Sequence, residues 1–476
     1  MTLTSLIDLL AQSPLIASVQ ATEGSASDDP YVLTKLALAS IQEGVQVLRL
    51  QGVENIRSVR AATNVPIIGL IKRTYPDSRV YITPTELEIR ELIDCGVNVI
   101  ATDATSRVRP HQENLRQLIA LAHENGLPVL ADIDSLESAE FALACGADCL
   151  STTLAGYTAE SPSTVGPDLD LLRKIVQITK VPVFAEGRYS QKWQVNAALR
   201  IGAEGVIVGG ALNDPIKTTR SLMPSRRANG NVGAVDIGGT WMRFGIFSPE
   251  WELLKVERMP VLEARQDRID WIRSQIESSG VTAVGVSSGG TVDPSTGELW
   301  EAKALIPDHV GTVFSEATLG VPTVALNDGL ASAWGHACLS QYAGKRVATL
   351  ALGTGVGCGF VADGKIQMGS RGEYPRLNDL PGPGGQTFED MLGGAALSPT
   401  PSGSQKATAL QAFLQAGIVL QEMYFPDQIV VCGAVGLSDW LKLYLQSPGL
   451  SASPFGFDAG IFGAAALVLY PPERVW

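Results

Sequence analysis

The sequence is poor in the residues that form structural metal sites and disulfides. Its 476 residues include only six cysteines and four histidines, and no two cysteines stand in a CxxC pair. We therefore expect neither a structural zinc site nor a disulfide framework, and buried reduced thiols are the simpler interpretation. The chain also lacks any run of about 18 consecutive apolar residues, so no membrane-spanning helix is predicted.

Basic residues are scarce as well. Lysine and arginine total 36 against 49 aspartates and glutamates, a formal net charge of −13 at pH 7. This charge disfavours functions that neutralise nucleic-acid phosphates, although a small phosphorylated molecule needs only local donors. The N-terminus, Met1-Thr2-Leu3-Thr4-Ser5, has no basic region or cleavage site of a secretory signal. We therefore expect a cytoplasmic protein of two or three domains that binds small molecules, without nucleic-acid or membrane partners.

What the first half does contain is a repeat. Four times a helix-like stretch ends in a glycine and runs into an apolar strand, and the spacing of roughly 50 residues accommodates two βα units. Between these points the sequence predicts further strands. The even repeat favours closure into a (β/α)8 TIM barrel over an open doubly wound sheet. The four glycines are Gly44, Gly96, Gly146 and Gly202, and the further strands are at residues 15–20, 66–73, 128–134 and 182–188.

A change of composition marks the end of this half. The stretch 213–231 is rich in Pro, Arg and Gly and has little apolar periodicity. We therefore predict a barrel domain over residues 1–224, a linker at 225–231 and a second domain over 232–476. Irregular alternation of strands, helices and glycine-rich turns in the second domain predicts another α/β unit, split into two lobes.

Polar side chains follow the predicted barrel strands at their C-terminal ends, where the active sites of such barrels lie. A single charged strand end is more often an ordinary salt bridge, but a set around one rim favours a site. Glycines after the last two strands, Gly187, Gly209 and Gly210, would let backbone N–H groups approach a phosphate. The rim residues are Gln20, Arg49, Lys72, Arg73, Asp103, Asp132, Glu186 and Arg188.

Six motifs stand in order along the same half. They are Gly69-Leu70-Ile71-Lys72-Arg73, Tyr81-Ile82-Thr83-Pro84-Thr85, Ala101-Thr102-Asp103-Ala104-Thr105, Ala131-Asp132-Ile133, Ser151-Thr152-Thr153-Leu154-Ala155-Gly156-Tyr157-Thr158 and Ala185-Glu186-Gly187-Arg188-Tyr189. Together they closely resemble the N-acylglucosamine-6-phosphate 2-epimerases, over about residues 5–222. This family interconverts N-acetylmannosamine 6-phosphate and N-acetylglucosamine 6-phosphate. The resemblance implies Lys72 and Glu186 as catalytic residues. The implied substrate contacts are Gln20, Arg49, Asp132, Gly187, Arg188, Gly209 and Gly210.

The residue types suit this chemistry. Epimerisation at C2 removes the proton next to the C1 carbonyl of the open-chain sugar and returns a proton to the other face. A lysine of lowered pKa and a carboxylate on opposite sides can do this work, and which group moves which proton stays open. The alternative is an aldolase in which Lys72 forms a Schiff base, which borohydride trapping with substrate would expose.

Two glycine turns in the second half follow apolar strands. The first is Asp236-Ile237-Gly238-Gly239-Thr240 and the second is Leu352-Gly353-Thr354-Gly355. Each can cradle a phosphate, so the pair predicts a nucleotide between two related halves, and no GxxxxGK[ST] string of a Walker A loop is present. Between them a predicted strand ends in Asn327-Asp328. This pair is either a simple turn or a catalytic base for a sugar hydroxyl that attacks a γ-phosphate.

The combination resembles the ROK family of sugar kinases, within the actin-like ATPase fold, over about residues 231–470. The resemblance implies ATP and Mg²⁺ as cofactors, Asp328 as the base and Asn327 as a sugar contact. For both halves it implies a homo-oligomer. The implied ATP-binding residues are Asp236, Gly238, Gly239, Thr240, Gly353, Thr354, Gly355 and Gly433.

The second half departs from the ROK pattern in its sugar pocket. Gly372-Glu373-Tyr374-Pro375-Arg376 stands where many ROK kinases have GExGH, and the CxCGxxGC zinc motif is absent. Cys432 stands where the family usually has a glycine. Glu373 and Glu389 still match the sugar-contacting acids of the family. We therefore expect these two glutamates to bind the sugar, and we expect no structural zinc.

The segment that contains Ala304-Leu305-Ile306-Pro307 is similar to N-acetylmannosamine kinases rather than to glucokinases. Such a kinase would supply the substrate of the barrel. We therefore expect a bifunctional enzyme of sialic acid and amino-sugar catabolism that phosphorylates N-acetylmannosamine and epimerises the product. The alternatives are a ROK domain with another sugar specificity, a non-catalytic sugar-binding module, and a sugar-sensing repressor. The repressor is disfavoured because a predicted barrel, not a DNA-reading helix-turn-helix, precedes Asp236.

Overall fold

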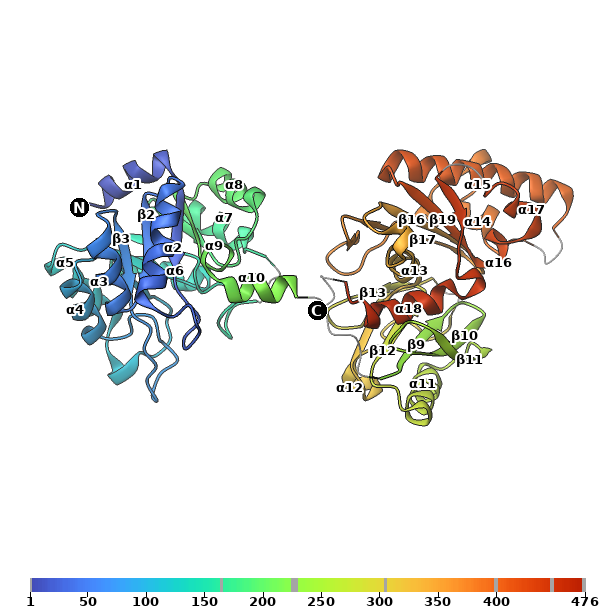
Figure 1. Cartoon of the computed structure of the whole chain (residues 1–476), viewed down its shortest axis with the longest axis horizontal. Coiled ribbons are helices and arrows are strands. Elements are labelled where there is room, and N and C mark those ends of the chain that lie inside the picture. The colour runs from blue at the N-terminus through green and yellow to red at the C-terminus, as the bar shows by residue number, and fades with distance from the viewer. Residues whose placement is uncertain are drawn as a thin grey trace. The chain divides into compact units, whose positions relative to one another are not determined.

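The computed structural model describes residues 2–162, 166–223, 230–303, 306–397, 401–445 and 449–472. The chain divides into two compact units, residues Met1–Met223 and Pro224–Trp476 (Figure 1). Most of the predicted linker, residues 225–229, lies outside the described residues. The domain limits derived from the sequence therefore stay a prediction.

The first unit is the barrel that the repeat predicted. Its parallel strands form a closed sheet in the order β1 to β8, and the pair Leu15↔Val206 between β1 and β8 completes the ring. The strands are β1 (Leu15–Val19), β2 (Val47–Gln51), β3 (Ile67–Leu70), β4 (Val99–Asp103), β5 (Val129–Asp132), β6 (Cys149–Ser151), β7 (Val183–Glu186) and β8 (Gly205–Val208).

Helices alternate with these strands, as the length of the repeat requires. The four repeat glycines have φ between 68° and 116°, the left-handed conformation that glycine adopts at least cost where a helix ends. The helices are α1 (Leu3–Gln12), α2 (Pro30–Gln42), α3 (Val53–Ala62), α4 (Glu86–Asp94), α5 (Leu115–Glu124), α6 (Leu136–Cys145), α7 (Leu169–Ile178), α8 (Lys192–Ile201), α9 (Gly210–Asn213) and α10 (Pro215–Leu222), with one 3-10 turn, η1 (Pro110–Gln112).

Two apolar layers stabilise the barrel. One lies between the strands and the surrounding helices, and the other fills the interior of the barrel. Helix α1 precedes β1, and its Leu6 and Leu10 are buried with Ile16 and Val47 in the interior layer. The N-terminal end of the barrel is therefore closed by apolar side chains, which leaves the opposite end for polar groups.

The second unit has the two predicted lobes, each built on a five-stranded sheet. One sheet has the order β11-β10-β9-β12-β15, the other β18-β17-β16-β19-β20, and β13 pairs with β14 in a small third sheet. The strands are β9 (Val232–Ile237), β10 (Trp241–Phe247), β11 (Leu253–Pro260), β12 (Val284–Ser288), β13 (Thr291–Val292), β14 (Leu299–Glu301), β15 (Thr323–Asn327), β16 (Val347–Leu352), β17 (Val356–Ala362), β18 (Lys365–Ile366), β19 (Gln428–Cys432) and β20 (Leu450–Ala452).

Two buried helices join these sheets. Helices α13 and α18 pack against each other, and one apolar cluster contains residues of both helices, of β15 and of β17 (Figure 1). Helix α18, with the sequence AGIFGAAALVL, is apolar on every side, as its position between two lobes requires. No helix in the described ranges is both long and apolar enough to span a membrane. The helices are α11 (Arg265–Ser279), α12 (Glu316–Leu319), α13 (Asp328–Ala337), α14 (Phe388–Leu392), α15 (Gly403–Tyr424), α16 (Gly433–Gly436), α17 (Asp439–Lys442) and α18 (Ala459–Leu469).

Candidate active sites

A large cavity opens at the C-terminal ends of the barrel strands. Its volume is about 1210 Å³, and it brings together residues that are far apart in the sequence. Most of the residues predicted for this half line it. They are Gln20, Arg49, Lys72, Arg73, Glu186, Gly187, Arg188, Gly209 and Gly210. Of the other predicted rim residues, Asp132 is fully buried beneath Arg49, and Asp103 is fully buried in a network of its own.

Lys72 reaches the cavity from outside the barrel sheet. Strand β3 ends at Leu70, three residues earlier than predicted, and Lys72 forms an antiparallel bridge with Ile82 instead. Its ammonium group donates a hydrogen bond of 2.7 Å to the side-chain oxygen of Gln20. The walls of the cavity partly desolvate Lys72, and this desolvation, followed by the positive charge of Arg49, lowers its pKa, although the side chain is still open to solvent. The neutral amine that a proton acceptor requires is therefore more accessible than in an ordinary lysine.

Arg49 is a buried cation at the floor of the cavity. Its guanidinium donates two hydrogen bonds to Asp132, of 3.0 and 2.7 Å, and lies 3.4 Å from Glu186. Burial opposes the charge of Arg49, but the two carboxylates raise its pKa further above its usual range. Arg49 thus stays cationic and is held in one orientation by a bidentate pair.

Glu186, the last residue of β7, is the carboxylate on the other side of the cavity. It accepts hydrogen bonds from Thr153, at 2.9 Å, and Ser151, at 3.2 Å. Burial, with a smaller contribution from the negative charge of Asp132, raises the pKa of Glu186 above its ordinary value, although Arg49 and the two hydroxyls oppose this. Ser151 and Thr153 were not predicted as site residues from the sequence. Their position at the end of β6 is the signal that could have identified them.

The topology places Lys72 and Glu186 opposite one another. In a closed barrel of eight strands, β3 and β7 are four strands apart and therefore face each other across the ring. One group capable of accepting a proton thus stands on each side of the cavity, with the fixed charge of Arg49 close to Glu186. Such an arrangement can remove a proton from one face of a bound carbon and return one to the other.

The buried ion pair at the floor makes a prediction about stability. Replacement of Asp132 by Asn leaves the Arg49 cation buried without its main partner, and we expect a loss of about 3–5 kcal/mol in the free energy of unfolding. Hydrogen–deuterium exchange of barrel peptides in the full chain measures this loss separately from the second unit. The matched control is Glu86→Gln, which removes an exposed pair with Arg90 and should cost about 0.5 kcal/mol or less. Equal losses for the two variants would contradict the prediction.

The glycines after β7 and β8 line the same cavity. Gly187 has a φ of 102°, and α9 begins directly after Gly209. The Lys217 ammonium, which was not predicted as a site group, lies beside Gly210 and 3.5 Å from Asp214. Arg188 donates hydrogen bonds of 2.8 Å to the carbonyls of Ala155 and Gly166. This end of the cavity combines glycine backbone with cations, which suits an anion.

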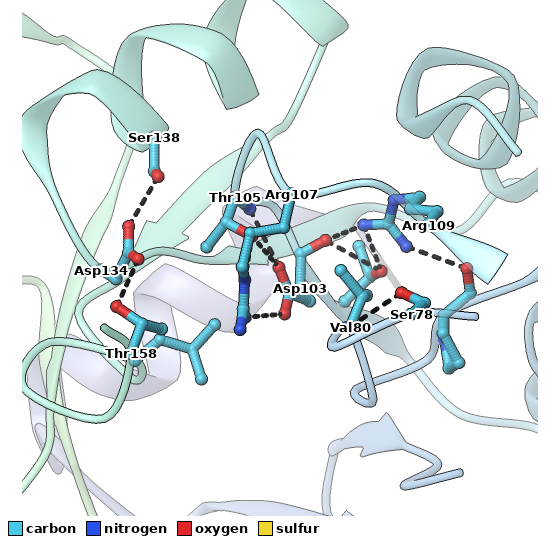
Figure 2. Close-up of polar contacts among 12 residues, drawn as sticks. Ser78, Val80, Asp103, Thr105, Arg107, Arg109, Asp134, Ser138 and Thr158 are labelled. Atoms are coloured by element: carbon cyan, nitrogen blue, oxygen red, sulfur yellow. Dashed lines mark hydrogen bonds and ion pairs between the residues drawn. The ribbon is translucent and has the colours of Figure 1, made fainter. Parts of the chain in front are cut away.

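Two of the predicted rim residues are turned away from the cavity floor. The Asp103 carboxylate pairs with Arg107 at 2.6 Å and with Thr105, within its own loop (Figure 2). Arg73 lies at the edge of the cavity, where it pairs with Glu88 and Glu91. Both charges are therefore accounted for by salt bridges. This is the simpler of the two interpretations of a charged strand end.

In the second unit the two predicted glycine turns face each other. The first joins β9 to β10 and the second joins β16 to β17, and the hydroxyls of Thr240 and Thr354 are 3.0 Å apart across the gap. The late glycine Gly433, which follows β19, has a φ of 86° and lies against the carbonyl of Leu352. Turns from both lobes thus meet at one place, as a site for the phosphates of a nucleotide requires.

Asn327 and Asp328 stand between the turns, where β15 ends and α13 begins. The Asn327 side chain accepts the N–H groups of Gly329 and Leu330 and donates to the carbonyl of Gly290 at 2.9 Å. Gly329 permits a close approach to β17, because a Cβ there would come within 2.3 Å of the Cys358 carbonyl. This packing brings the start of α13, and hence Asp328, to the glycine-rich side of β17.

Asp328 has the properties of a base. Burial, followed by the negative charge of Asp236, raises the pKa of Asp328 to about 6. Asp236 is itself engaged, since it contacts Arg243 at 2.5 Å and accepts a hydrogen bond of 2.9 Å from Ser287. One carboxylate of the pair is therefore balanced by an arginine, and the other has its pKa raised to about 6.

The two predicted sugar acids lie in different surroundings. Glu389 accepts the Val356 N–H at 2.9 Å and touches the second glycine turn at Gly355. Glu373 accepts the N–H of Arg371 at 2.9 Å, within its own loop. The structure thus brings Glu389, but not Glu373, into contact with the turn. Of the segment similar to N-acetylmannosamine kinases, residues 304–305 lie outside the described residues. Within the described part of the chain, no group of three or more His, Cys, Asp or Glu side chains could hold a metal ion.

Comparison with known proteins identifies both halves. Residues 33–225 match the family described as "Putative N-acetylmannosamine-6-phosphate epimerase", and residues 232–377 match the ROK family. The bifunctional enzyme NanE/NanK of Brucella melitensis is 30% identical over 95% of this chain and 95% of its own length. A solved structure, the N-acetylmannosamine-6-phosphate 2-epimerase from Clostridium perfringens, is 38% identical over 46% of this chain and 94% of that one, with a TM-score of 0.45. The chain therefore belongs to the bifunctional NanE/NanK family, and it is an enzyme that combines an amino-sugar epimerase with a ROK-type kinase.

Proposed function

We propose that the barrel converts N-acetylmannosamine 6-phosphate to N-acetylglucosamine 6-phosphate. The observation that supports this most is the position of Lys72 and Glu186 on opposite sides of one cavity. One of them removes the C2 proton of the open-chain sugar, and the other returns a proton to the opposite face. Arg49 then provides a fixed positive charge for the enolate oxygen that develops at C1.

The substrate phosphate has a matching end of the cavity. Gly187, Gly209 and Gly210 allow the backbone to approach it, and Lys217 adds a cation beside Gly210. Gln20, which accepts the hydrogen bond of Lys72, orients the amine toward the sugar. Asp132 positions Arg49 through their ion pair, and it accepts a hydrogen bond of 2.6 Å from the Thr153 hydroxyl.

We further propose that the second unit transfers the γ-phosphoryl group of Mg-ATP to O6 of N-acetylmannosamine. Asp328 takes the proton of the O6 hydroxyl as this oxygen forms its bond to phosphorus and the bond to the β-phosphate breaks. The turns at Gly238–Thr240 and Gly353–Gly355 hold the phosphates, and Asn327 contacts the sugar. Mg²⁺ would neutralise charge on the phosphates when bound, while the Asp236 carboxylate is already engaged by Arg243 and Ser287.

The product of the proposed kinase is the substrate of the proposed epimerase. Fusion of two consecutive steps in one chain is coherent, whereas a glucokinase would yield nothing that the barrel uses. The Glu373 carboxylate is engaged by the Arg371 N–H of its own loop, which favours one alternative, a kinase pocket that prefers another sugar.

A coupled assay tests both halves of the proposal. The full chain is given ATP with N-acetylmannosamine, N-acetylglucosamine or glucose, and the products are resolved by NMR. N-acetylmannosamine should yield N-acetylglucosamine 6-phosphate. If no sugar is phosphorylated but added N-acetylmannosamine 6-phosphate is epimerised, the second unit is a different kinase or a binding module. If glucose is preferred, the pocket at Glu373 and Glu389 has another specificity.

The raised pKa of Asp328 predicts how phosphorylation depends on pH. A base is active when deprotonated, so kcat/KM should fall as the pH drops through about 6, the pKa of Asp328. An ordinary aspartate would keep activity down to about pH 4. Initial rates of ADP release between pH 5 and 8, with the structure monitored at each pH, measure the profile. A rate that stays constant from pH 7 to pH 5 would rule out this assignment of the pKa.

A further inference from the structure

The position of Lys72 depends on a second stretch of chain. Residues 71–83 form an irregular hairpin in which Lys72 pairs with Ile82. The N–H of Arg73 donates to the Tyr81 carbonyl at 2.9 Å, and the N–H of Thr83 donates to the Ile71 carbonyl at 2.7 Å. Both arms of the hairpin therefore line the cavity, the first with Lys72 and the second with Tyr81 among others. Any displacement of the second arm moves Lys72 with it.

The second arm turns at a residue with an unfavourable backbone. Thr83 is fully buried and has a φ of 43°, a conformation that a β-branched residue adopts rarely. Such a conformation persists only where the surroundings hold it. The first arm contributes one such contact, since the Ile71 N–H donates to the Thr83 hydroxyl at 3.2 Å.

The remaining contacts come from behind the hairpin, from β4 and the loop that follows it. The Thr102 hydroxyl donates to the Thr83 carbonyl at 2.9 Å, and the Asp103 N–H donates to the Ile82 carbonyl at 3.0 Å. Arg109 donates to the Pro84 carbonyl at 3.1 Å and also to the Asp103 carbonyl. Figure 2 shows Arg109 directed toward Asp103, while Arg107 reaches the carboxylate of the same residue from the other side.

Arg109 has an unusual set of partners for a buried arginine. Its side chain is only 4% exposed, and its hydrogen bonds go to two carbonyls and, at 3.4 Å, to the Thr102 hydroxyl. Burying a cation against carbonyl oxygens, without a carboxylate partner, costs free energy. Its presence here suggests that it fixes a particular arrangement of the chain. Neither Thr102 nor Arg109 lines the cavity, and their hydrogen bonds to Thr83 and to Pro84, the residue that follows the hairpin, connect them to Lys72.

We propose that Thr102 and Arg109 are positioning residues of the epimerase, which hold the second arm of the hairpin so that Lys72 and Tyr81 face the substrate. The catalytic readout rests on the proposed function of the barrel. A second readout, the chemical reactivity of Lys72, does not. The charged groups that act on Lys72 are Arg49, Glu186, Lys217 and Asp132, and none belongs to the hairpin. A shift of the hairpin therefore changes the distance of Lys72 from all four.

The gentlest test is Thr102→Val, which keeps the shape of the side chain and removes its hydroxyl. We expect kcat for epimerisation to fall about 10-fold or more, with KM within about twofold, because small misplacements of a catalytic group are costly. Arg109→Gln should behave likewise, and Arg109→Lys should restore part of the loss. Phosphorylation by the same chain should not change.

Two controls separate positioning from a general loss of stability. Thr34→Val removes a buried hydroxyl of α2 whose partners, the Pro30 carbonyl at 2.7 Å and the Ser58 hydroxyl at 2.8 Å, are outside the hairpin. Arg107→Gln removes a cation on the same loop as Arg109 whose partners, Asp103 and Thr105, are outside the hairpin. Both controls should retain kcat. The proposal is overturned if Thr102→Val epimerises at the wild-type rate, or if Thr34→Val loses as much.

The reactivity of Lys72 is measured without a sugar. Acetic anhydride at a series of pH values, followed by mass spectrometry of the peptide, gives the midpoint at which Lys72 becomes reactive, with exposed Lys35 as reference. In the wild type the Lys72 midpoint should lie below that of Lys35, and Thr102→Val should move it toward Lys35. An unchanged midpoint overturns the proposal. A wild type that shows this shift but epimerises no N-acetylmannosamine 6-phosphate would instead refute the proposed substrate.

Discussion

Replacement of Lys72 by methionine is expected to lower kcat for epimerisation by about 10³-fold, within the range typical of a lost general acid or base. Methionine retains most of the length of lysine and removes only its amine. The hydrogen bond to Gln20 and the charge near Arg49 are lost, but neither supports the barrel, since Lys72 stands beyond the end of β3. Phosphorylation should therefore continue, and N-acetylmannosamine 6-phosphate should accumulate.

The same experiment can assign the two protons. Each epimer is incubated separately in D₂O with the Lys72→Met and Glu186→Gln variants, and deuterium at C2 is followed by NMR. If Lys72 takes the proton of one epimer and Glu186 that of the other, each variant should lose exchange with a different epimer. Lys35→Met, an exposed lysine of α2 that packs over the ring of Tyr31, is the matched control. Full activity of Lys72→Met with both epimers would refute the role of Lys72.

The second large effect is expected for Asp328→Asn, which should lower kcat for phosphorylation by about 10²–10⁴-fold. Asparagine has the same shape, and its oxygen can still accept the Gly329 N–H, which the carboxylate accepts at 2.8 Å. The start of α13 should therefore be preserved while the base is lost. Because this substitution also removes a charge close to Asp236, we expect no loss of thermal stability.

The kinase test has an internal and an external control. Epimerisation of added N-acetylmannosamine 6-phosphate by Asp328→Asn should equal that of the wild type, because Asp328 belongs to the second unit. Asp363→Asn, in the exposed turn between β17 and β18, should phosphorylate normally, since asparagine tolerates the φ of 52° found there. Normal phosphorylation by Asp328→Asn would mean that another group accepts the proton.

The barrel and most of its candidate site follow from local patterns in the sequence. Gly44 and Gly202 end helices in the left-handed conformation that their position predicted, and strand β9 begins at Val232 as expected. Strand-end polarity located Arg49 and Glu186, because parallel strands in a barrel carry their last residues to one rim. These features depend on periodicity, turn preference and chain direction, which nearby residues determine.

The tertiary structure decided which polar groups share the site. Asp103 and Asp132 both end barrel strands, yet the first pairs with Arg107 in its own loop and the second with Arg49 across the barrel. Thr153 was not predicted as a site residue, because its role depends on the contacts of its hydroxyl with Asp132 and Glu186. Partners of this kind come from strands far apart in sequence, so no local pattern specifies them.

The placement of Lys72 shows the same division most clearly. The sequence by itself determined that a lysine follows the third strand of a barrel, which suits acid–base chemistry and, as the alternative, Schiff-base chemistry. Only the tertiary structure placed that lysine on a hairpin beyond β3, whose second arm receives hydrogen bonds from Thr102 at Thr83 and from Arg109 at the next residue, Pro84. The physical reason is that strand formation is a local property, whereas the direction and pKa of an amine depend on charges and hydrogen bonds that folding brings together.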